Sequence, residues 1–227
     1  MRRGNIRLII PLVRVFTLKY HMEEKKKTVR LDFSKIEFQF YFYITGVPAA
    51  LFMVMAKTLL KDNILTNPQN LSAVMYETNN QLCAQNDADM FVTLFSAIID
   101  LSSGEMTFAN AGHNPPLVRR ADKFSLLGRA QSPIFGTIPD LTFPSKKIRL
   151  EAGDAIFLYT DGVTDAMNQN HELFGEKRLQ LVLDKISFED DAKKILSEVK
   201  SAVKDFVGSA PQSDDITMLA LVLCGKV

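Results

Sequence analysis

The sequence predicts an α+β fold, with helices layered on antiparallel sheet. Two observations support this: helix-like segments occur in pairs, and a run of short strand-like segments lies between the pairs. Strands and helices that are grouped separately along a chain are typical of this class. The 227 residues, 47% of them hydrophobic and 23% charged, suffice for one sizeable core.

Four helices are expected. Gly46 and Pro48 open an apolar helix that reaches residue 61, and this segment is apolar nearly all round, which predicts deep burial. Asn67 is the expected N-cap of the second helix and Ser187 that of the last, where acidic residues follow in the first turn. The third helix is expected over residues 175–185.

Strands are predicted from short runs of β-branched, aromatic and aliphatic residues between turn residues. They are expected over residues 90–101, 105–111, 117–118, 124–127, 141–150, 155–159 and 216–223. The run 155–159 is apolar throughout and stands between Asp154 and Asp161, which indicates a buried strand. Asp161 therefore falls where a strand gives way to a loop.

Residues 1–44 differ from the rest of the chain. They hold ten Lys/Arg and four Asp/Glu, a net charge of +6, whereas the remainder holds 17 and 22, a net charge of −5. Residues 8–18 could form a strand, and residues 38–44 contain five aromatics in seven positions. The acidic body argues against a nucleic-acid surface there; the basic segment keeps nucleic-acid binding open as an alternative.

Two cysteines, Cys83 and Cys224, give neither a metal-ligand spacing nor a disulfide framework, which favours a reducing cytoplasm. No apolar run reaches the ~18 residues expected of a membrane span. The histidines are isolated from one another, so a histidine-based zinc site is not expected.

Acidic residues offer the clearest candidate chemistry. Asp161 ends one predicted strand, and Asp214 and Asp215 precede the last one, so the two loops could converge. Oxygen ligands select hard cations such as Mg²⁺ or Mn²⁺. The alternative is structural: Asp-Gly is a common turn, and an aspartate before a strand is often a cap or turn residue.

Several motifs occur in an order that resembles a known family. They are VPAALFM at 47–53, MFVTLF at 90–95, ANAGHNPP at 109–116, LYTDGVTDA at 158–166, FG at 174–175 and SDDIT at 213–217. Together they resemble the SpoIIE-like branch of the metal-dependent serine/threonine phosphatases, the protein phosphatase 2C (PP2C) superfamily. The resemblance covers about residues 45–224.

The resemblance implies an α-β-β-α sandwich of two antiparallel sheets flanked by helices, with two Mn²⁺ or Mg²⁺ ions. Asp161 and Asp214 match family metal ligands, and Gly162 and Asp215 would orient the loops. Metal-activated water would hydrolyse phosphoserine or phosphothreonine, with no catalytic side chain besides. The usual substrate in this branch is a phosphorylated anti-sigma-factor antagonist. His113 could donate a proton or be a satisfied loop histidine.

The sequence departs from the family before residue 47. The first metal motif, Gly-Asp-Val-Ser-Gly-Lys-Gly or similar, is replaced by residues 40–46, FYFYITG, and Tyr41 stands where the bridging aspartate is expected. A neutral phenol is a poor ligand for a hard cation. We therefore expect impaired phosphatase activity; the alternative is a catalytically dead pseudophosphatase that binds phosphoproteins.

This departure also predicts the domain division. Residues 45–227 form the phosphatase domain, whose N-terminal strands are atypical or incomplete. Residues 1–44 are a separate basic and aromatic segment, and we hypothesise that it comes from another reading frame or a rearranged start. The coding DNA upstream of codon 45 tests this, because another frame should encode a Gly-Asp-x-Ser-Gly-like sequence.

Overall fold

The computed structural model describes residues 7–15, 47–87, 89–128, 132–187 and 189–223. These residues form two compact units, and each contains a four-stranded antiparallel sheet with helices packed against it. The predicted α+β class, with two antiparallel sheets flanked by helices, is confirmed. None of the described helices combines the length and apolar content needed to cross a lipid bilayer.

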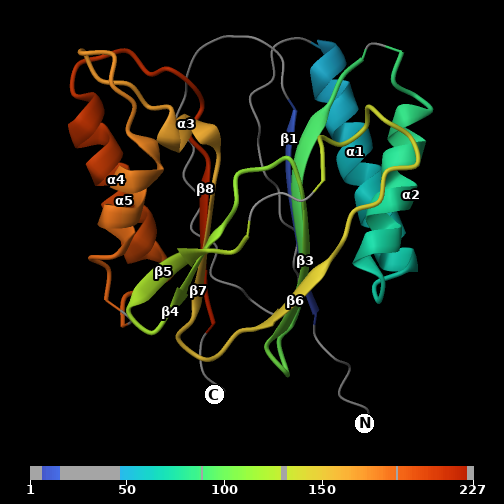
Figure 1. The fold of residues 1–227 in the computed structure, drawn as a ribbon, viewed down its shortest axis with the longest axis horizontal. Helices are drawn as coiled ribbons and strands as arrows, with labels where there is room; N and C mark the ends of the chain where they lie inside the picture. The colour runs from blue at the N-terminus through green and yellow to red at the C-terminus, as the bar shows by residue number, and fades with distance from the viewer. Residues whose placement is uncertain (1–6, 16–46, 88, 129–131, 188, 224–227) are drawn as a thin grey trace. The chain divides into compact units, whose positions relative to one another are not determined.

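Unit 1 carries the first pair of helices. Its sheet has the strand order β1-β2-β3-β6, and α1 and α2 lie on one face of it (Figure 1). The element bounds are β1 (Arg7–Val15), α1 (Val47–Thr66), α2 (Leu71–Cys83), β2 (Val92–Asp100), β3 (Glu105–Ala111) and β6 (Lys146–Arg149). Strand β2 is buried over all but its last residue, as expected for a central strand with both faces apolar.

The strand considered possible over residues 8–18 is present as β1. It pairs with β2 along its whole length, from Arg7 opposite Asp100 to Val15 opposite Val92. Pro11 is tolerated because β1 is an edge strand among the described strands, where one side needs no ladder hydrogen bond. Part of the atypical N-terminal segment thus joins the sheet of unit 1, while residues 38–44 lie outside the described residues.

The predicted deep burial of α1 holds for one of its faces only. Phe52, Leu60 and Ile64 are at most 2% exposed and pack in the core of unit 1, but Leu51 and Leu65 are 64% and 65% exposed. The apolar residues are spread so evenly around the helix that the sequence gives no sign of which face meets the sheet.

Two predicted helix starts were wrong by a few residues. The second helix is capped by Asn70, whose side chain accepts a hydrogen bond from Ala73 N, and not by Asn67. The last helix is capped by Asp191, which accepts from Lys194 N, and not by Ser187. In each case a second good capping residue stands closer to the apolar stripe, and the stripe decides between them.

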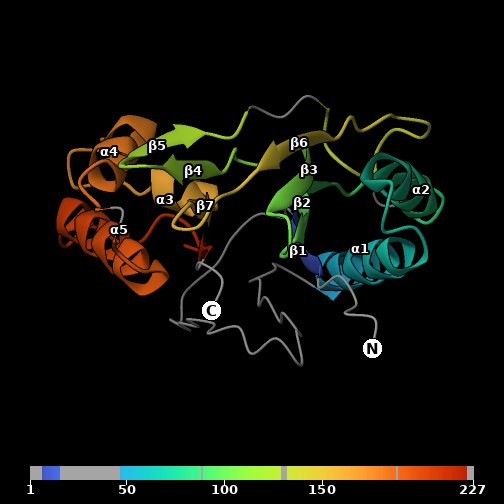
Figure 2. The ribbon, with the colours of Figure 1, turned by 90° about the horizontal axis from the view of Figure 1, so that it is seen from below.

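Unit 2 carries the second group of helices and all the predicted site residues. Its sheet has the strand order β5-β4-β7-β8, and α4 and α5 lie side by side against it (Figure 2). The bounds are β4 (Leu117–Arg120), β5 (Lys123–Leu126), β7 (Ala155–Tyr159), α3 (Asp161–Thr164), α4 (Gly175–Leu183), α5 (Ala192–Val207) and β8 (Met218–Val222). Phe157 and Tyr159 of β7 pack against the buried side chains of the two helices.

Candidate functional site

Strands β7 and β8 bring the two acidic loops together. They are antiparallel neighbours, with Ala155 opposite Val222 and Tyr159 opposite Met218. The last residue of β7 and the first residue of β8 therefore lie at the same end of this strand pair. Thr160 extends this pairing by one residue, because its backbone N donates to Thr217 O at 3.0 Å. The expectation that the loops converge is met.

Gly162 lies directly against the other loop, at Asp215. A Cβ atom placed on it would lie 2.1 Å from Asp215 O and 2.7 Å from the carbonyl carbon of Asp215. Such distances exclude every larger residue unless the backbone moves. The Asp-Gly sequence is therefore more than a local turn, because the glycine lets the 161–162 turn rest directly on the chain at Asp215.

Side-chain hydroxyls tie the loops together on both sides of Asp214. Thr160 Oγ1 donates to Asp215 O at 3.1 Å and accepts from Thr217 N at 3.0 Å. Ser213 Oγ donates to Asp165 O at 2.9 Å. These contacts were not predicted. The only signal in the sequence is a threonine directly before Asp-Gly and a serine directly before Asp-Asp.

The two candidate ligands differ in exposure. Asp161 is the first residue of the short helix α3, and its Oδ1 atom is buried. Asp214 is exposed, and its Oδ1 accepts a hydrogen bond from Asp215 N at 2.7 Å. Asp215, the predicted loop-orienting residue, thus supports Asp214 through its amide and contacts Gly162 through its carbonyl. Its side chain is not needed for either contact.

Tyr159, which precedes this turn, does not add an anionic ligand. Its side chain is 2% exposed, and burial, assisted by the charge of Glu176, raises the pKa of Tyr159 to about 12. The phenol is therefore neutral at pH 7. Tyr159 therefore offers no anionic oxygen to a cation, unlike the carboxylates of Asp161 and Asp214.

The donor set fits a hard cation only in part. Asp161 and Asp214 supply carboxylate oxygens from adjacent loops, which suits Mn²⁺ or Mg²⁺. Within the described residues, however, no group of three or more His, Cys, Asp and Glu side chains could hold an ion. Asp161 and Asp214 could therefore contribute two carboxylates to a metal site, but the described residues do not complete a two-metal centre. Tyr41 lies outside the described residues.

His113 belongs to unit 1 and is a buried loop residue. It is 3% exposed, and the loop is closed by Asn110, which accepts from His113 N and donates to His113 O, both at 2.9 Å. These bonds hold the loop in shape, and neither of them tests whether the ring is that of a satisfied loop histidine. They involve the backbone of His113, so a role for the ring in proton transfer stays a prediction.

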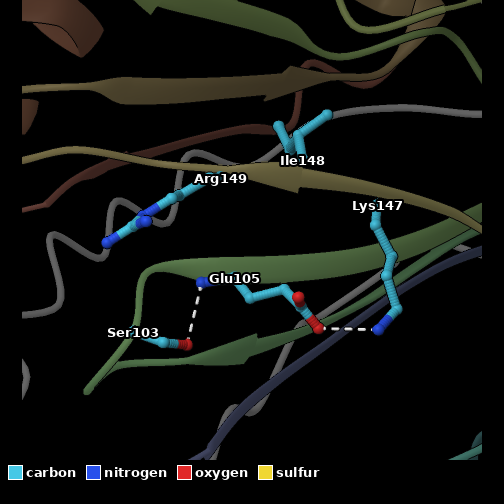
Figure 3. Close-up of a pocket in the computed structure, with 5 residues that line it drawn as sticks. All are labelled: Ser103, Glu105, Lys147, Ile148 and Arg149. Atoms are coloured by element: carbon cyan, nitrogen blue, oxygen red, sulfur yellow. Dashed lines mark hydrogen bonds and ion pairs between the residues drawn. The ribbon is translucent and has the colours of Figure 1, made fainter.

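A surface pocket of about 330 Å³ lies in unit 1 and contains none of the predicted site residues. Figure 3 shows its lining, in which Lys147 of β6 and Glu105 of β3 form an ion pair at 2.7 Å and Ser103 accepts a hydrogen bond from Glu105 N. Both charged side chains are about half exposed or more, so the pair contributes little to stability. We assign this pocket no function.

Comparison with known proteins identifies the family. The family model described as Stage II sporulation protein E (SpoIIE) matches residues 45–223. Protein IcfG of Synechocystis sp. is 34% identical over 155 residues, which cover 67% of this chain and 24% of IcfG. Phosphoserine phosphatase RsbU of Bacillus subtilis is 29% identical over 153 residues, 66% of this chain and 43% of RsbU.

Among solved structures, the RsbU and RsbW domains of Rv1364c from Mycobacterium tuberculosis align with a TM-score of 0.67 and 20% identity, over 95% of this chain and 51% of that one. At this identity the likeness concerns the fold. The chain spans less than half the length of IcfG and of RsbU. The family match covers most of the chain, including both acidic loops. The chain therefore belongs to the SpoIIE family of PP2C-type serine/threonine phosphatases.

Proposed function

We propose that this chain is a Mn²⁺- or Mg²⁺-dependent phosphatase domain that acts on phosphoserine or phosphothreonine of a regulatory protein. We further propose that the phosphatase activity of this sequence is impaired. The observation that carries the proposal is the junction of the Asp161 and Asp214 loops at the ends of β7 and β8. Asp161 and Asp214 are the proposed metal ligands, and Gly162 and Asp215 hold the loops against each other.

The residues of the chain have distinct parts in this proposal. Asp161 presents a partly buried carboxylate at the start of α3, and Asp214 presents an exposed one that an ion can reach. When bound, Mn²⁺ or Mg²⁺ would activate water for attack on phosphorus and neutralise charge on the phosphoryl group. No side chain of the acidic loops needs to act as a nucleophile.

The proposed impairment follows from Tyr41. A bridging carboxylate shared by two ions lowers their mutual repulsion, and a neutral phenol cannot replace it. We expect the remaining carboxylates to bind one ion weakly and a second ion hardly at all. The proposed substrate class is a phosphorylated anti-sigma-factor antagonist in a bacterial cytoplasm. The relative named phosphoserine phosphatase RsbU supports the hydrolysis of phosphoserine.

The second candidate is a pseudophosphatase that docks a phosphoprotein without cleaving it. The observation in its favour is that the described residues contain no group of three metal-binding side chains. In this case the acidic loops would keep the shape of the site but not its chemistry. Substitution of Asp161 and Asp214 by asparagine would then leave phosphoprotein binding unchanged.

Titration calorimetry with Mn²⁺ separates the two candidates. The proposal predicts weak binding of one ion that disappears in the Asp161→Asn variant, because the amide removes one of the two charges. Asp165→Asn, at the exposed end of the same turn, is the control and should bind Mn²⁺ like the unaltered chain. Binding that is absent, or insensitive to Asp161→Asn, would favour the pseudophosphatase; tight binding of two ions would overturn the impairment.

A further inference from the structure

Thr160 connects the two acidic loops through a single buried hydroxyl. The residue is 2% exposed, and its Oγ1 is both a donor to Asp215 O at 3.1 Å and an acceptor from Thr217 N at 3.0 Å. The backbone of Thr160 adds a third bond, from its N to Thr217 O at 3.0 Å. One residue at the end of β7 thus makes three hydrogen bonds to the chain that leads into β8.

Thr160 and its bonding partner Asp215 each lie next to a candidate metal ligand in the sequence. Thr160 directly precedes Asp161, and its partner Asp215 directly follows Asp214. The hydroxyl therefore joins the neighbour of one acidic residue to the neighbour of the other. A change in these bonds is therefore expected to alter how far apart the two loops lie.

We propose that Thr160 is a positioning residue that fixes the separation and orientation of the Asp161 and Asp214 carboxylates for a divalent cation. This inference rests on the proposed function. Residues that orient metal ligands act by holding the ligands in the binding geometry before the ion arrives, so less order has to be imposed on binding. Thr160 touches neither the ion nor the substrate in this role.

Two other features support a fixed separation. Gly162 admits no side chain between the loops, so they already stand at contact distance. Ser213 Oγ, on the other side of Asp214, donates to Asp165 O at 2.9 Å. This second tie is exposed and competes with water, so it should matter less than the buried hydroxyl of Thr160.

Thr160→Val tests the proposal, because it replaces the hydroxyl by a methyl group at nearly constant volume. Thr160→Ser keeps the hydroxyl and removes the methyl group. Thr137→Val is the matched control: Thr137 Oγ1 is buried and makes no hydrogen bond to other described residues, so the same substitution there breaks no tie. The free Mn²⁺ signal in electron paramagnetic resonance gives the dissociation constant of each full-length variant.

We expect Thr160→Val to weaken Mn²⁺ binding by about tenfold or more, the usual effect of losing a residue that orients metal ligands. Thr160→Ser and Thr137→Val should keep the affinity of the unaltered chain. Hydrogen exchange at the Thr217 amide, measured without metal, should be faster in Thr160→Val only. A purely structural residue would lower the melting temperature and leave Mn²⁺ affinity of the folded protein unchanged.

The outcomes separate this inference from the proposed function. If the unaltered chain binds Mn²⁺ and Thr160→Val binds it equally well, the positioning role is wrong and the metal-dependent function stands. If the unaltered chain binds no Mn²⁺ at any concentration tested, both are wrong. Weakening in Thr160→Ser equal to that in Thr160→Val would also overturn the inference, because the hydroxyl would not be the cause.

Discussion

Restoring the first metal motif of the family is expected to raise Mn²⁺-dependent phosphatase activity by about 100-fold or more. Even partners outside the ligand set change metal affinity or activity by about 10- to 100-fold when altered, and a missing ligand should count for at least as much. The variant replaces residues 40–45 while keeping Gly46, through Phe40→Gly, Tyr41→Asp, Phe42→Val, Tyr43→Ser, Ile44→Gly and Thr45→Lys.

The control for this variant differs from it at one atom. It carries the same changes except that Tyr41→Asn replaces Tyr41→Asp, so the glycine context is restored without the carboxylate. Initial rates of hydrolysis of a phenyl phosphate ester, with and without Mn²⁺, compare the two. Equal rates in the aspartate and asparagine variants would show that position 41 does not supply the missing ligand.

Gly162→Ala is expected to lower the free energy of unfolding by about 2 kcal/mol or more, as overpacking in a close-packed interior does. The added Cβ would meet Asp215 O at 2.1 Å, and the obstacle is backbone, which cannot rotate away. Relief of this clash must separate the loops that carry Asp161 and Asp214. Mn²⁺ affinity should therefore fall together with stability.

Gly208→Ala is the control, because it separates steric from conformational cost. Gly208 has φ of +60° and nothing within 4 Å of its would-be Cβ. Alanine there should lower stability only through the backbone conformation of this residue, with φ of +60° and ψ of −120°, and leave Mn²⁺ binding unchanged. Urea unfolding of both variants measures the difference. An unchanged free energy of unfolding in Gly162→Ala would contradict the close approach between the loops.

The convergence of the acidic loops could be predicted from the sequence. Asp161 follows a short apolar run and Asp214 precedes another, and aspartates at strand ends meet when the strands are neighbours. That β7 and β8 are neighbours could not be derived from either run, since α3, α4 and α5 separate them in the chain. The match of Asp161 and Asp214 to two metal ligands of the family added weight to the expected convergence.

The ties between the loops could not be predicted, for a physical reason. Whether Thr160 meets Thr217 or a residue two positions away depends on the register of β7 and β8, and several registers keep the same apolar pattern. The same holds for the exposed face of α1, which its evenly spread apolar residues leave undefined. Local capping signals predicted the helix starts more closely, because the expected N-caps lie only three or four residues before the observed ones.

The most direct test of the proposed impairment is Mn²⁺-dependent hydrolysis of a phenyl phosphate ester by the unaltered chain. We expect turnover that is slow or undetectable and that does not approach the rate of the variant with the restored motif. The reason is that the chain keeps the acidic loops of the family while Tyr41 stands in place of the bridging carboxylate. Robust turnover that is abolished by Asp161→Asn would contradict this expectation, because the site would then be complete without an aspartate at position 41.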